Sequence, residues 1–73
     1  MKNVIQFTIE KDEDGVYVAS GINVPIVTDG QTFEELQVNI KEAVSLYLEE
    51  GQKDFVKSPA VIANFDLTPM SYA

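Results

Sequence analysis

The chain of 73 residues contains no cysteine and no histidine, and no arginine occurs anywhere in it. Without cysteine there are no disulfides and no thiolate metal ligands. Without histidine, the commonest general base and the commonest zinc ligand are missing. Without arginine, the usual bidentate clamp for phosphate is missing. These absences argue against an ordinary Ser-His-Asp hydrolase, and we expect no catalytic, cofactor-binding or metal-ligating residue.

Long apolar runs are also missing. No stretch approaches the ~20 apolar residues of a membrane span, and the first residues lack the continuous apolar core of a signal peptide. The four glycines stand far apart and are typical of turns, not of a phosphate-binding loop. We therefore expect a cytoplasmic protein that has no membrane partner and is not an enzyme.

Acidic residues dominate the charge. Twelve acidic residues stand against five basic ones, so the formal net charge is -7. Such a surface repels phosphate, which predicts no direct nucleic-acid partner and favours a basic protein. The hydrophobic fraction of 45% indicates a folded globule. We expect a single domain over residues 1–73. Its core is small, and domains of this size often gain stability by oligomerisation.

Three strands are expected before the helix. Residues 4–10 alternate apolar and polar, as a half-buried strand does. The acidic turn (residues 12–15, DEDG) ends in Asp-Gly, a strong hairpin signal. Residues 16–20 form the second strand and residues 24–28 a third, short one. Pro25 places the third strand at a sheet edge, because proline cannot donate a ladder hydrogen bond.

A capped helix follows a predicted turn at residues 29–30. Thr32 is the expected N-cap, and Glu35 completes a capping box. An apolar stripe at helical spacing runs to about Leu48, and Gly51 is the expected C′ residue. Residues 52–59 are expected to be a polar connector, and residues 60–67 the last strand.

The predicted fold class is therefore α+β with the order β-β-β-α-β. The first three strands form an antiparallel meander, and the last strand joins parallel to the first after a right-handed crossover. This gives a four-stranded mixed sheet of order 3-2-1-4 with one helix on one face.

The acidic turn is the one dense charge group, and three interpretations of it remain open. The turn could bind a metal ion, it could contact a basic protein, or it could be a plain solvated turn. The alternating ligands of a calcium loop are absent from it. Its candidate partner-binding residues are Asp12, Glu13, Asp14 and the neighbouring aromatic Tyr17.

A second candidate surface serves self-association. The last strand would lie at a sheet edge and has neither proline nor lysine in residues 60–67, so it lacks two common guards against pairing. Apolar residues also lie beside or outside the helix stripe. The candidates are Val38, Leu46, Val61 and Ile62, and we expect at least a homodimer.

Together these motifs resemble a known family over residues 4–67. Residues 12–19 (DEDGVYVA) resemble the hairpin of HicB-like antitoxins, and residues 28–35 (TDGQTFEE) resemble their turn into the helix. Residues 39–43 (NIKEA) and 47–48 (YL) resemble the helix itself. The resemblance implies a partial ribonuclease H-like fold without nuclease activity or a cofactor.

The resemblance also implies a partner. Members bind and block a small basic HicA toxin, an mRNA-cleaving ribonuclease, and the acidic charge suits such a partner. The toxin-binding candidates are then Asp12, Glu13, Asp14 and Tyr17. The alternative is an orphan HicB-like domain that self-associates as a scaffold or binds a small ligand. Whether the neighbouring reading frame encodes a short, lysine-rich protein distinguishes the antitoxin from the orphan domain.

Overall fold

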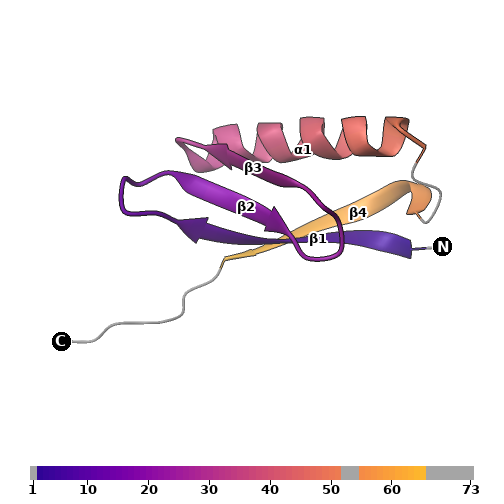
Figure 1. The fold of residues 1–73 in the computed structure, drawn as a ribbon, viewed down its shortest axis with the longest axis horizontal. Coiled ribbons are helices and arrows are strands. Elements are labelled where there is room, and N and C mark those ends of the chain that lie inside the picture. The colour runs from indigo at the N-terminus through magenta and orange to yellow at the C-terminus, as the bar shows by residue number, and fades with distance from the viewer. Residues whose placement is uncertain (1, 52–54, 66–73) are drawn as a thin grey trace.

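A computed structural model, which describes residues 2–51 and 55–65, shows a sheet of four strands with one helix on one face (Figure 1). The elements are β1 (Lys2–Lys11), β2 (Tyr17–Gly21), β3 (Val27–Gly30), α1 (Phe33–Glu49) and β4 (Phe55–Phe65). The strand order is β3-β2-β1-β4. Neighbours are antiparallel except β1 and β4, which are parallel. The predicted α+β class and the order 3-2-1-4 are confirmed.

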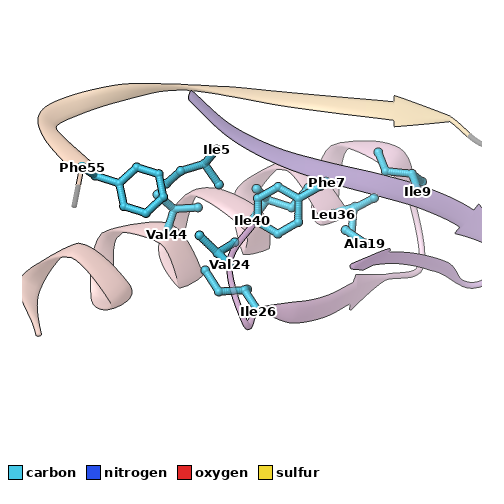
Figure 2. Packing of buried hydrophobic residues seen from close by; sticks show 10 residues of the cluster. All are labelled: Ile5, Phe7, Ile9, Ala19, Val24, Ile26, Leu36, Ile40, Val44 and Phe55. Atoms are coloured by element: carbon cyan, nitrogen blue, oxygen red, sulfur yellow. The ribbon is translucent and has the colours of Figure 1, made fainter. Parts of the chain in front are cut away.

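The core lies between the helix and one face of the sheet (Figure 2). On β1 the alternating residues Ile5, Phe7 and Ile9 are buried, while Gln6 and Thr8 between them are only half-buried. The helix contributes an apolar stripe, and loop and strand residues complete the cluster. Its ten buried members are Ile5, Phe7, Ile9, Ala19, Val24, Ile26, Leu36, Ile40, Val44 and Phe55.

Caps fix both ends of α1. The Thr32 hydroxyl accepts a hydrogen bond from the N–H of Glu35 at 3.0 Å, as the sequence predicts. The Glu35 carboxylate accepts from the N–H of Gln31 at 3.0 Å, one residue earlier than in a standard capping box. At the other end Gly51 has φ +86°, the left-handed conformation expected of a C′ glycine.

The third strand differs from its prediction. Residues 24–28 were expected to form it and residues 29–30 to turn, but β3 spans Val27–Gly30. Pro25 lies before the strand, which does sit at the sheet edge as predicted. Gly30 has no positive φ. It is needed because a Cβ there would lie 2.5 Å from the backbone nitrogen of Leu36, so the Asp-Gly pair serves close packing and not a turn.

The last strand also differs from its prediction. It begins at Phe55, inside the expected polar connector of residues 52–59, and therefore contains Pro59. The reason is that Phe55 is buried and packs edge-to-face on Tyr47, with ring centroids 6.2 Å apart. Residues 66–67 of the predicted strand lie outside the described residues.

Asn23 holds the loop between β2 and β3 against β1. Its side-chain oxygen accepts from the N–H of Gln6 at 2.9 Å, and its side-chain nitrogen donates to the carbonyl of Val4 at 2.8 Å. The N–H of Ile22 donates to the Gln6 carbonyl at 2.8 Å. Asn23 thus replaces a paired strand where β2 has ended, and it satisfies backbone groups that would otherwise lack partners.

Candidate protein-binding surface

The acidic turn is built around Asp12. Its carboxylate accepts hydrogen bonds from the N–H groups of Asp14 and Val16, both at 2.9 Å. Gly15 closes the turn with φ +85°, and its N–H donates to the Asp12 carbonyl at 3.0 Å. Asp12 is therefore committed to the turn itself. The side chains of Glu13 and Asp14 are exposed to solvent.

Tyr17, the first residue of β2, belongs to an aromatic cluster with Phe33 and Phe65. Its ring centroid lies 6.0 Å from that of Phe33 and 5.7 Å from that of Phe65, both edge-to-face. The Phe33 and Phe65 rings stack at 6.3 Å. The ammonium nitrogen of Lys11 lies 5.4 Å from the centroid of the Tyr17 ring. The aromatic cluster thus stands directly beside the acidic turn.

This cluster remains partly open to solvent. Phe33 is 42% exposed and Phe65 is 44% exposed, although both rings have aromatic neighbours. Exposed aromatic rings flanked by carboxylates are typical of protein interfaces, where aromatic anchors sit inside a polar rim.

A hollow of about 240 Å³ separates α1 from β4. It is lined mainly by apolar side chains, among them Phe33, Ile40, Val61 and Ala63, with Lys41 at the helix side. Val61 and Ala63 lie beside core residues of β1 on the face that the helix covers elsewhere. Both are nevertheless exposed, and α1 contacts the sheet mainly through β3 and β2.

The four self-association candidates are exposed, but the structure does not bring them together. Val61 faces the hollow, and its neighbour Ile62 points to the opposite face of the sheet. Val38 and Leu46 lie exposed on α1. Leu46 sits in a shallow depression of about 420 Å³, and three of the four other side chains that line it are charged.

No group of three carboxylates in residues 2–51 and 55–65 is placed to hold a metal ion. No helix within the same residues is long and apolar enough to cross a membrane. What this surface offers is a set of carboxylate, aromatic and aliphatic contacts beside one another at the hairpin end of the sheet.

The role of Phe33 and Phe65 could not be found from sequence periodicity. Phe33 fits the apolar stripe of the helix. Phe65 fits the alternation of the last strand, where it is expected to be a core or interface residue. Their meeting with Tyr17 depends on the sheet register, which pairs Phe65 with Ile9 and Ile9 with Ala19. The sequence does place Phe33 at the start of the predicted helix, whereas Phe65 lies inside the predicted strand of residues 60–67.

Several proteins from distant organisms resemble this chain. UPF0150 protein Ta0767 of Thermoplasma acidophilum is 46% identical over 55 residues, which are 70% of this chain and 75% of that protein. A UPF0150 protein of Helicobacter pylori is 35% identical over 68 residues, 88% of this chain and 94% of that protein. One of Thermotoga maritima is 38% identical over 52 residues, with coverages of 71% and 74%.

No family model matches the chain, and no solved structure matches it either. The three relatives nevertheless share one family name, and each match covers more than two thirds of both proteins. The chain belongs to the UPF0150 family.

Proposed function

We propose that this chain is a non-catalytic, HicB-like antitoxin that binds and neutralises a small basic ribonuclease toxin of the HicA type. The observation that carries the proposal is the meeting of the acidic turn and the partly exposed aromatic cluster at one end of the sheet. The resemblance of residues 4–67 to HicB-like antitoxins supports the same assignment.

Charge favours a basic partner. The chain carries a formal charge of -7, and Glu13, Asp14, Glu34 and Glu35 are all exposed near the aromatic cluster. Carboxylates at the rim of an interface accelerate the approach of a positively charged protein, and they discriminate against acidic competitors. A ribonuclease binds the negatively charged phosphates of RNA with a basic face. The same basic face is attracted by the negative charge of this surface.

The aromatic side chains supply the apolar contact that charge alone lacks. Tyr17 is half-buried, and its position is fixed by both phenylalanine rings. Phe33 is exposed at the first residue of α1. Rings that are already held in place lose little conformational freedom when a partner covers them, so they suit the centre of an interface.

The first experiment is co-expression with the neighbouring reading frame. We expect a short, lysine-rich protein to co-purify with this chain, and its RNA-cleaving activity to fall to background at an equimolar ratio. Full ribonuclease activity in the presence of excess chain would falsify the antitoxin role.

The second experiment tests the surface by charge neutralisation. In one variant Asp12→Asn, Glu13→Gln and Asp14→Asn replace the acidic turn, and Asn at position 12 keeps the acceptor that the turn needs. A matched variant carries Glu42→Gln and Glu49→Gln on the helix and Glu50→Gln at its C-cap, all at exposed positions. Both variants lose three negative charges, so they differ only in where the charge is removed.

We expect the turn variant to associate several-fold more slowly with the toxin at low salt, with a weaker salt dependence. The helix variant should change the rate less. Equal rate changes in the two variants would show that only the net charge matters, and would count against the acidic turn as the contact.

The second candidate function is a self-associating scaffold that has no toxin partner. The exposed apolar edge of β4, with Val61 and Ile62 at 40% and 43% exposure, favours it. The neighbouring reading frame distinguishes the two, because a scaffold needs no basic partner encoded beside it.

A further inference from the structure

We propose that two copies of this chain pair through the outer edges of β4, antiparallel to each other about a two-fold axis at Ala63. The two sheets then form one continuous sheet. β4 lies at the end of the strand order, so its outer edge has no neighbouring strand among the described residues. This dimer does not depend on the proposed toxin.

The direction of the backbone groups follows from the bonds of β1. The N–H of Gln6 and the carbonyls of Val4 and Gln6 point toward the loop after β2. Strand geometry then directs the backbone groups of Ile5 and Phe7 toward β4. In a parallel pair each such residue bonds to the two residues that flank its register partner.

The register pairs Ile5 with Val61 and Phe7 with Ala63. The residues of β4 that bond to β1 are therefore Ala60, Ile62 and Asn64. The alternate residues Val61, Ala63 and Phe65 direct their N–H and carbonyl groups to the outer edge.

A two-fold axis at Ala63, the central one of these three residues, produces a self-complementary set of side chains. Ala63 lies opposite Ala63 of the second copy. Val61 of each copy lies opposite Phe65 of the other. A large ring thus meets a smaller side chain at each end, with two small side chains on the axis. Pro59, which has no N–H to offer, remains outside these pairs.

The side chains add apolar contact on the helix side of the joined sheet. Phe65 of the second copy would stand opposite Val61, one of the β4 residues that line the hollow of about 240 Å³. A stable dimer needs roughly 800 Å² of surface from each partner, more than a short strand edge supplies. The exposed apolar side chains of Val61, Ile62 and Phe65, together with the hollow, add to the contact that the strand edge makes.

Charge explains why a second copy fits this edge better than another surface. Residues 58–65 contain no charged side chain, in a chain of net charge -7. The outer surface of α1 carries several carboxylates, so two helices would bring like charges together. Antiparallel pairing also places the two acidic turns at opposite ends of the dimer, because each turn lies near the Phe65 end of its own sheet.

The register of the two β4 strands is tested by disulfide cross-linking. The chain has no native cysteine, so only an introduced cysteine can form the cross-link. In the proposed dimer the two Ala63 Cα atoms lie about 5.5 Å apart, within the range that a disulfide spans. Ala63→Cys should therefore give a disulfide-linked dimer on oxidation. Leu46→Cys is the matched control, an exposed position on the helix that should stay uncross-linked.

The association itself is tested by sedimentation equilibrium at micromolar concentration. We expect a dimer mass for the wild type and, for Val61→Lys, a dissociation constant at least tenfold higher with an unchanged circular dichroism spectrum. Ile62→Lys, on the other face and opposite Asn64, should weaken the dimer less. A monomer mass for the wild type, or cross-linking of Leu46→Cys but not of Ala63→Cys, would overturn the proposal.

Discussion

The side chain of Asn23 replaces backbone pairing at two positions of β1. Its amide bonds the N–H of Gln6 and the carbonyl of Val4, at a place where β1 has no strand on that side. Both sites are part-buried, so water reaches them poorly when the amide is removed. Losing a partner at such a site costs more than the mean value of a hydrogen bond.

We therefore expect Asn23→Ala to lower the free energy of unfolding by about 1–3 kcal/mol. Asn23→Asp should also destabilise, because a carboxylate still accepts from Gln6 but cannot donate to Val4. Urea unfolding followed by circular dichroism measures both changes. A neutral Asn23→Ala variant would show that water replaces the amide without loss.

Glycine is required for different reasons at positions 30 and 51. A Cβ at Gly30 would lie 2.5 Å from the nitrogen and 2.8 Å from the Cα of Leu36, both backbone atoms that cannot rotate away. At Gly51 nothing lies within 4 Å of an added Cβ, but φ is +86°. The first position is limited by space and the second by conformation.

Gly51→Ala should cost roughly 1–2 kcal/mol, the usual penalty of a left-handed residue that has a Cβ. Gly30→Ala should cost more, since β3 and the start of α1 must move apart to admit the methyl group. Thermal unfolding of the two variants side by side gives the order. A larger loss for Gly51→Ala would contradict the packing argument.

At the scale of the element, the helix depends on its N-cap. The Thr32 hydroxyl satisfies the N–H of Glu35, one of the first-turn donors that have no partner within the helix. Thr32→Ala should therefore destabilise the protein by about 1 kcal/mol, while Thr32→Ser keeps the acceptor and most of the stability. Urea midpoints measure the pair, and equal midpoints for Ala and Ser would show that the cap contributes little.

The helix and the strand order were predictable because local signals agree with the fold. Thr32, Glu35 and Gly51 mark the ends of the helix by their chemistry, and the alternation of β1 marks its buried face. The Asp-Gly pair at residues 29–30 led to the wrong prediction of a turn. Its glycine is required because the backbone of Leu36 packs closely against it, a contact that no local sequence pattern reveals. The start of β4 was missed because Phe55 is fixed by Tyr47 on the helix.

The candidate surface was only partly predictable. The acidic turn and Tyr17 are adjacent in sequence, so their proximity follows from the hairpin alone. Phe33 and Phe65 join Tyr17 from the helix and the last strand, which requires the full register of the sheet. The backbone direction at the β4 edge likewise depends on bonds made by Asn23 and Ile22, two strands away from that edge.

At the scale of the whole molecule, the charge of -7 acts on the two proposed associations in opposite directions. Two copies repel each other, and the contact proposed between them is an uncharged edge. Added salt screens that repulsion, because the Debye length falls from about 10 Å at 0.1 M to about 3 Å at 1 M. A basic toxin is attracted by the same charge, and salt weakens that attraction.

Raising the salt from about 0.05 to 0.5 M should therefore tighten the dimer and weaken the toxin complex. Sedimentation equilibrium measures the first change, and binding kinetics with the purified toxin measure the second. The Val61→Lys variant serves as the control, since it should lose the first response and keep the second. A dimer that salt dissociates would mean that ionic contacts hold it together, and would contradict association through the uncharged β4 edge.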